Sequence, residues 1–237
     1  MIRSIVIVLL IFLLSCDKDA FIPSETPLPN PPLIVKPPVI NTWLALGDSY
    51  TIGQGVQEAD RYPAQTITRL RENGILIDTL RYIATTGWTT QELLNAITER
   101  KPLNHTIVSL LIGVNDQYRG IDSGIYRKNF RQALGKAIFL ANGKRENVFV
   151  ISIPDYSVTP YSQFADTVRI RKEIDFFNAI NKEETAVYGC PYLDITASTR
   201  LGRTEKDLIA ADGLHPSGIE YWKWARDLAP LIERTLK

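Results

Sequence analysis

Ser49 is the residue of this chain with the clearest capacity for chemistry. The apolar run Leu44-Ala-Leu stops at Gly47-Asp48-Ser49, and glycines follow at positions 53 and 55. A buried strand that ends at a serine in a glycine-flanked turn presents the hydroxyl at the rim of a sheet. That hydroxyl is a weak nucleophile until a base takes its proton. The chain must therefore also supply a base, a group that orients the base, and donors for an oxyanion.

The chain holds two histidines, and these are the candidate bases. His215 lies just before the amphipathic stretch at the end of the chain, and Asp212 stands three residues earlier. The Asp212 carboxylate can accept from one imidazole nitrogen and leave the other free to face Ser49. His105 precedes a predicted strand, at the opposite edge of the sheet. We predict that Ser49, His215 and Asp212 form a catalytic triad and that His105 has a structural role.

The oxygen of a tetrahedral intermediate on Ser49 needs hydrogen-bond donors. The Ser49 amide is one candidate. The Gly87 amide is a second, since glycine lets the backbone approach a ligand closely, and the Asn115 side-chain amide is a third. Taken singly, Gly87 fits an ordinary loop and Asn115 fits a turn equally well. Because each follows a predicted strand, we interpret Ser49, Gly87 and Asn115 as an oxyanion hole.

Strand-like and helix-like stretches alternate along the chain and predict the elements that position these residues. The apolar, strand-like runs are Trp43–Leu46, Thr79–Ala84, Thr106–Ile112, Val148–Ile153 and Tyr192–Ile195. The amphipathic, helix-like stretches are Arg61–Asn73, Thr90–Arg100, Tyr126–Asn142, Thr167–Tyr188 and Ser217–Lys237. This alternation predicts an α/β fold: a three-layer α/β/α sandwich with a central parallel sheet of about five strands. Two of the helices begin with capping-box spacing, Thr89 with Glu92 and Ser217 with Glu220.

In an open parallel sheet, ligands bind beyond the carboxyl ends of the strands. Ser49, Gly87 and Asn115 each follow the end of a predicted strand, and His215 follows the fifth strand after a short connection. The candidate residues therefore gather at one edge of the sheet. Neither an internal repeat nor a second linker interrupts residues 41–237, so we expect one domain there.

The residues named above resemble the sequence blocks of a known family, the SGNH (GDSL-type) hydrolases. Its four sequence blocks resemble Gly47-Asp48-Ser49, Gly87, Gly113-Val114-Asn115-Asp116 and Asp212-Gly213-Leu214-His215-Pro216. The resemblance implies a flavodoxin-like α/β/α fold and metal-free hydrolysis of esters through an acyl-serine intermediate. It implies either O-acetylated carbohydrates or lysophospholipids and other short acyl esters as substrates. One departure, Tyr50-Thr51 after the serine, bears on substrate rather than mechanism.

Three other functions compete with this interpretation. A metal hydrolase would have to use Asp48, Asp116, Asp212 and His215, and one histidine without a ligand-spaced pair disfavours it; Asp48 more plausibly shapes the turn. A phosphate loop at residues 47–55 would need the lysine or the glycine spacing of the nucleotide-binding motifs, which the sequence lacks. A surface glycan-binding lipoprotein on a hydrolase-like scaffold is the non-enzyme alternative. We expect neither a metal nor another cofactor.

Aromatic residues near the predicted site are candidates for substrate binding. Trp88 adjoins Gly87, Tyr118 closely follows Asn115, and Tyr156 begins a loop that also carries Tyr161 and Phe164. Aromatic rings suit the face of a sugar or an acyl chain equally, and a plain packing role fits them as well. Arg119 could favour an anionic group near the ester or could be a solvated loop arginine.

Composition and charge exclude some partners. The chain has 237 residues, 22% of them charged, and a formal net charge of +1. This balance shows no basic excess for nucleic acid. Of the two cysteines, Cys190 is expected to be a buried, inert thiol.

The first forty residues predict export and a lipid anchor. Arg3 precedes an unbroken apolar run, Ile5–Leu14, which is far shorter than the about 20 residues that span a bilayer and has the form of a secretory signal. Leu13-Leu14-Ser15-Cys16 resembles a bacterial lipobox. The resemblance implies a signal peptide over residues 1–15 and lipid on Cys16. Residues 16–40 are rich in proline and predict an extended tether. We therefore expect an exported, membrane-anchored bacterial lipoprotein.

Overall fold

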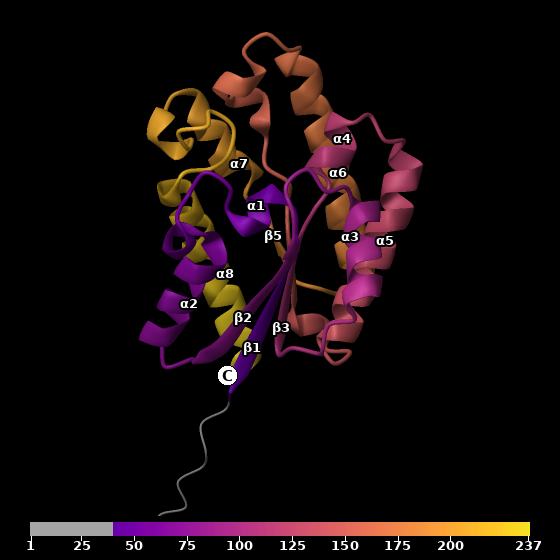
Figure 1. The fold of residues 1–237 in the computed structure, drawn as a ribbon, viewed down its shortest axis with the longest axis vertical. Coiled ribbons are helices and arrows are strands. Elements are labelled where there is room, and N and C mark those ends of the chain that lie inside the picture. The colour runs from indigo at the N-terminus through magenta and orange to yellow at the C-terminus, as the bar shows by residue number, and fades with distance from the viewer. Residues whose placement is uncertain (1–39) are drawn as a thin grey trace, which may run out of the picture. The chain divides into compact units, whose positions relative to one another are not determined.

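A parallel five-stranded sheet in the order β2-β1-β3-β4-β5 forms the centre of the fold (Figure 1). The computed structural model describes residues 40–237. The strands are β1 (Asn41–Gly47), β2 (Ile77–Ala84), β3 (Ile107–Leu111), β4 (Val148–Ile151) and β5 (Tyr192–Leu193). Every neighbouring pair is parallel. The predicted fold class is confirmed, and the strand order is that of flavodoxin-like sheets.

Helices cover both faces of this sheet (Figure 1). One face carries α2 (Tyr62–Glu72) and α8 (Gly218–Leu236), which pack against each other. The other carries α3 (Thr90–Arg100), α5 (Ser123–Leu140) and α6 (Thr167–Tyr188), with α5 between the other two. Because both faces are covered, β3 and β4 are buried along their whole length. Burial on both faces explains why these strands read as continuous apolar runs.

Short helices follow several strands, and the sequence did not predict them. The α-helical ones are α1 (Ser49–Ile52), α4 (Val114–Tyr118) and α7 (Thr196–Thr199). The 3₁₀ turns are Glu58–Asp60, Arg145–Asn147, Tyr156–Val158, Pro160–Ser162, Arg200–Arg203 and Lys206–Leu208. A helix of one turn is too short to show the 3.6-residue period on which the prediction relied.

Side-chain hydrogen bonds account for two of the differences at element ends. Helix α5 begins before the predicted Tyr126 because the Asp122 carboxylate accepts from the backbone of Gly124 and Ile125. Strand β5 stops after Leu193 because the backbone N–H of Ile195 donates to the Ser152 hydroxyl instead of continuing the ladder.

The two predicted capping boxes differ in outcome. Thr89 and Glu92 form both reciprocal bonds at the start of α3. At the start of α8, Ser217 accepts from the Glu220 amide, but the buried Glu220 carboxylate accepts from the Trp224 indole. The spacing predicted both capping boxes. The second is incomplete because the buried indole of Trp224 binds the Glu220 carboxylate.

The predicted signal peptide, Cys16 and nearly all of the proline-rich tether lie outside the described residues. None of the helices within residues 40–237 is long and apolar enough to cross a membrane. The residues of the candidate site all belong to one compact unit.

Candidate active site

The turn between β1 and α1 holds Ser49 at the carboxyl edge of the sheet. Asp48 is the N-cap of α1, and its carboxylate accepts from the Tyr50 amide at 3.0 Å. Gly47 is required here by close approach, since a Cβ would lie 2.0 Å from Thr51 Oγ1 and 2.2 Å from the Leu111 carbonyl oxygen. The turn therefore fixes Ser49, which is only 4% exposed, between β1 and β3, where the strand order reverses.

His215 and Asp212 line up behind the serine. His215 Nε2 lies 2.9 Å from Ser49 Oγ, and His215 Nδ1 lies 2.7 Å from Asp212 Oδ2. The second carboxylate oxygen of Asp212 accepts from the backbone N–H of Leu214 and His215. One oxygen thus fixes the loop while the other fixes the imidazole. The structure brings together the three residues that the sequence predicted as a triad.

The carboxylate of Asp212 is held in its charged form. Partial burial by itself would raise its pKa, but the backbone N–H groups of Leu214 and His215 and the imidazole lower the pKa below its ordinary value. An ionised Asp212 can orient the imidazole and stabilise its protonated form. The ring of Tyr50 packs against His215 with ring centroids 5.0 Å apart, a contact that the sequence did not indicate.

The predicted oxyanion donors are the backbone amides of Ser49 and Gly87 and the side-chain amide of Asn115, and of these three residues Ser49 and Asn115 line one cavity. Within residues 40–237 the amides of Ser49 and Gly87 donate no hydrogen bond, so both remain available to an oxyanion. Gly87 has φ +80°, a conformation that glycine adopts readily. Asn115 Nδ2 donates to the Trp88 carbonyl at 3.0 Å and makes a long contact of 3.4 Å to Asp48 Oδ2. One amide hydrogen of Asn115 is therefore anchored and the other is weakly held.

Asp48 and Asp116 form a buried acidic pair beside the site, with exposed fractions of 0% and 1%. Burial raises the pKa of Asp48 to about 8, and the charge of Asp116 adds to the effect. Burial also raises the pKa of Asp116, against two hydrogen bonds from Thr90. Burial therefore favours the protonated form of Asp48, whose side chain caps α1. Across residues 40–237 the structure groups no three His, Cys, Asp or Glu side chains in a way that could hold a metal ion.

A small cavity opens directly on the nucleophile. It encloses about 80 Å³. Its lining residues are Ser49, Tyr50, Val114, Asn115, Tyr118, Tyr156, Tyr161, Leu214 and His215. We call this cavity the serine bowl. Tyr118 and Tyr156, two of the predicted substrate residues, line it.

Trp88, the third predicted substrate residue, lies elsewhere. It packs against the hydrophobic core, and the guanidinium of Arg100 lies 5.4 Å from the centre of its ring. Its carbonyl accepts from the Asn115 side chain, and Trp88 is not among the lining residues of the serine bowl. Tyr50, Val114 and Leu214 line the bowl without having been predicted, because their types suit a core position equally well.

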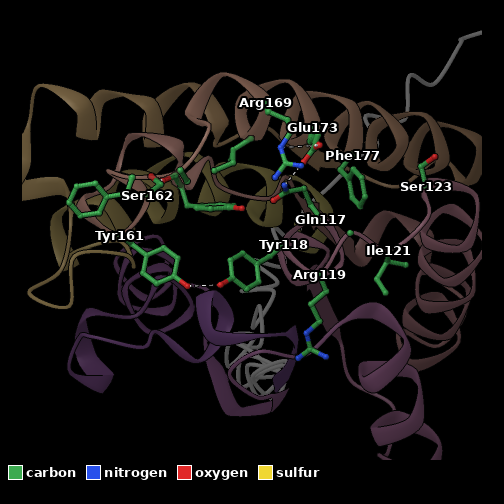
Figure 2. A pocket seen from close by; sticks show the side chains of 15 residues that line it. Gln117, Tyr118, Arg119, Ile121, Ser123, Tyr161, Ser162, Arg169, Glu173 and Phe177 are labelled. Atoms are coloured by element: carbon green, nitrogen blue, oxygen red, sulfur yellow. Dashed lines mark hydrogen bonds and ion pairs between the residues drawn. The ribbon is translucent and has the colours of Figure 1, made fainter.

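A wider cavity of about 740 Å³ adjoins the serine bowl (Figure 2). Tyr118, Tyr156 and Tyr161 line both cavities, and the hydroxyls of Tyr118 and Tyr161 lie 2.8 Å apart. Arg119, at its rim, donates to the Gly87 carbonyl and pairs with Glu92 at 3.4 Å. We call this second cavity the tyrosine groove.

The two remaining candidates of the sequence lie away from the site. His105 is buried at the opposite edge of the sheet, where its Nδ1 lies 2.8 Å from the Leu103 carbonyl oxygen. Cys190 is half-buried, and burial raises the pKa of its thiol to about 11. A thiol with that pKa holds its proton at neutral pH and is a poor nucleophile.

Comparison with known proteins agrees with the chemistry that this geometry permits. The model of the GDSL-like lipase/acylhydrolase family matches residues 45–221. The match spans more than half of the chain, so the protein belongs to this family. Its members hydrolyse esters, and the protein is accordingly a carboxylic ester hydrolase.

Solved structures show the same fold at low sequence identity. An acetylxylan esterase, Axe2 from Geobacillus stearothermophilus, is 20% identical with a TM-score of 0.59, and the match covers 81% of this chain and 94% of that one. TesA is 19% identical with a TM-score of 0.59, over 81% and 98% of the two chains. A lipase/acylhydrolase from Enterococcus faecalis is 22% identical with a TM-score of 0.57, over 83% and 95%. No curated protein matches the sequence.

Proposed function

We propose that the protein hydrolyses esters of short acyl groups, O-acetyl esters above all, through an acyl-serine intermediate. The carrying observation is the alignment of Ser49 Oγ, His215 and Asp212 by contacts of 2.9 Å and 2.7 Å. His215 takes the proton of the Ser49 hydroxyl while Oγ attacks the ester carbonyl carbon. Asp212 stabilises the imidazolium that results.

The oxyanion then lies against the N–H groups of Ser49 and Gly87 and the side-chain amide of Asn115. When the tetrahedral intermediate collapses, the bond to the alcohol oxygen breaks and His215 returns its proton to that oxygen. Water, activated by the same imidazole, attacks the acyl-serine and releases the carboxylic acid. Ser49 regains its proton from His215, so the cycle closes without another reagent.

The size of the serine bowl favours a short acyl group. Its volume of about 80 Å³ is far below the roughly 300–1,000 Å³ of typical small-molecule sites. An acetyl group has three heavy atoms and fits such a space, whereas the chain of a lysophospholipid does not. An acetylxylan esterase among the structures with this fold agrees with the choice.

The non-enzyme alternative, a glycan-binding lipoprotein, has less support. A binding surface needs neither an imidazole aligned on a serine nor a carboxylate aligned on that imidazole. The described part of the chain contains both contacts.

Hydrolysis of p-nitrophenyl acetate tests the mechanism. The wild type is expected to hydrolyse this ester without added metal and in the presence of a chelator. Ser49→Ala removes the nucleophile and is expected to lower kcat by at least about 10⁴-fold, the usual cost of losing a triad member. Undiminished activity of Ser49→Ala would refute the acyl-serine mechanism.

We also propose that lipid on Cys16 anchors the exported protein to a membrane. The support is the placement of the cysteine two positions after Leu14, the last residue of the apolar run Ile5–Leu14. Metabolic labelling with a palmitate analogue should tag the wild type and leave Cys16→Ser untagged. Equal labelling of both proteins would contradict this anchor.

A further inference from the structure

Gln117, which lines the tyrosine groove, carries a buried acceptor that the protein leaves unpaired. Gln117 is 6% exposed, and its Nε2 donates to Glu173 Oε2 at 2.7 Å. Its Oε1 is buried and has no hydrogen-bond partner among the described residues. A buried polar atom without a partner is costly and rare, so it requires an explanation.

Tyr156 lines the same groove as Gln117. Burial raises the pKa of the Tyr156 phenol to about 12, so its hydroxyl keeps its proton and can donate a hydrogen bond. No hydrogen bond of ordinary geometry joins the two side chains. A ligand hydroxyl, which both donates and accepts, can bridge the phenol and the amide oxygen.

The rest of the lining also suits a ligand with many hydroxyls. Glu173 offers a carboxylate beside Gln117, and Figure 2 shows the two side chains meeting on the α6 side of the groove. The rings of Tyr118 and Tyr156 stand edge to face with centroids 6.2 Å apart. Hydrogen-bond acceptors next to aromatic faces match the hydroxyls and the apolar ring faces of a sugar.

Other ligand classes fit this lining less well. A long acyl chain would leave Gln117 Oε1 unpaired and would cover the Glu173 carboxylate with apolar atoms, and burial of unpaired polar groups is unfavourable. An anionic headgroup would face the Glu173 carboxylate, while Arg169 already lies 3.8 Å from that carboxylate. The volume of about 740 Å³ is within the roughly 300–1,000 Å³ of typical ligand sites.

We propose that the tyrosine groove is a subsite for the carbohydrate part of an O-acetylated sugar oligomer. Gln117 and Glu173 recognise the sugar through hydrogen bonds to its hydroxyls. This proposal rests on the proposed function, because it assigns the alcohol side of the ester whose acetyl group enters the serine bowl. The three tyrosines shared by the two cavities connect the sites. A sugar hydroxyl donates to Gln117 Oε1 and accepts from the Tyr156 phenol, and a further hydroxyl donates to Glu173.

The first test compares two substrates in one variant. Gln117→Leu removes the unpaired acceptor at similar volume, and Gln91→Leu, on the exposed surface of α3, is the matched control. We measure kcat/KM for a mono-O-acetylated xylotetraose and for p-nitrophenyl acetate. The ratio of the two values is expected to fall about tenfold in Gln117→Leu through a higher KM for the sugar ester, and to stay constant in the control. An unchanged ratio would overturn the proposal.

A second variant tests the same proposal independently, in case Gln117→Leu does not fold. Glu173→Gln changes a side chain that is 38% exposed, and Glu183→Gln, 61% exposed on the same helix, is its control. The same ratio is expected to fall about threefold or more in Glu173→Gln only. Unacetylated xylotetraose titrated into the wild type by calorimetry should bind, and binding should weaken in Gln117→Leu. No binding of this probe to the wild type would overturn the proposal.

These experiments separate the two proposals. If the acyl-serine mechanism fails, p-nitrophenyl acetate hydrolysis survives in Ser49→Ala, while the calorimetric result still reports on the groove. A kcat/KM for lysophosphatidylcholine that exceeds the value for the acetylated sugar, and that falls in Gln117→Leu, would assign the groove to a lipid and overturn the carbohydrate subsite.

Discussion

His215 and His105 lie at opposite edges of the same sheet, and each lines a cavity. The cavity beside His105 is the larger of the two, about 610 Å³ against about 80 Å³ for the serine bowl. His105 contacts a backbone carbonyl, and Arg81 and Arg100 line its cavity. His215 contacts a serine on one side and a carboxylate on the other. Convergence of groups, rather than volume, makes one edge a candidate site.

The difference follows from the direction of the strands. All five strands of the described sheet are parallel, so every loop that follows a strand reaches the edge with His215. The loop after β1 brings Ser49, and the loop after β3 brings Asn115. The edge with His105 receives the loops that end helices. Four predictions sharpen this contrast.

The largest effect is expected at the carboxyl edge. His215→Ala removes the base and should lower kcat for p-nitrophenyl acetate by about 10⁴-fold or more. Steady-state kinetics measure the loss, and circular dichroism checks that the variant is folded. A folded variant that keeps more than a tenth of the activity would remove the distinction between the two histidines.

Asn115→Ala is expected to have the next largest effect. Loss of one oxyanion donor lowers kcat by roughly 10²–10³. Because the Asn115 amide also holds the Trp88 carbonyl at 3.0 Å, the variant is compared with the wild type for thermal stability as well. An effect confined to KM would show that Asn115 only binds substrate.

Asp48→Asn should change how stability depends on pH. Burial raises the pKa of Asp48 from 3.8 to about 8, so between these values the folded state holds a proton that the unfolded state has released. The free energy of unfolding of the wild type therefore falls as pH rises from about 4 to 8 through this group. Urea denaturation at pH 5, 6.5 and 8 should show that the free energy of unfolding of the variant increases relative to that of the wild type as pH rises. A difference that does not vary with pH would contradict the burial argument.

The smallest effect is expected at the amino edge. His105→Ala should leave kcat and KM within about twofold, since no contact links His105 to Ser49. The lost hydrogen bond to the Leu103 carbonyl should lower the free energy of unfolding by about 1–2 kcal/mol. A folded variant without activity would mean that the base has been assigned to the wrong histidine.

The alternation of apolar runs and amphipathic stretches predicted the parallel sheet and the five long helices, because each of these elements is long enough to show its period. It did not predict α1 and α4, although both lie at the candidate site. Their single turns are fixed by Asp48 and Gly113 and by packing, and such turns have no periodic signal. The sequence makes Trp88 a candidate substrate residue because an aromatic beside Gly87 carries no sign of whether it faces core or cavity.

The sequence by itself determined the local parts of the site. Gly47 and Asp48 shape the turn that presents Ser49, and the spacing of Asp212 and His215 puts a carboxylate beside its imidazole, because these contacts span only a few residues. Only the tertiary structure decided that His215 Nε2 lies 2.9 Å from Ser49 Oγ, across 166 residues of sequence. It also decided the size of the serine bowl, the raised pKa of Asp48 and the unpaired oxygen of Gln117. These properties depend on which side chains from distant segments exclude water, and that is set by packing rather than by residue type.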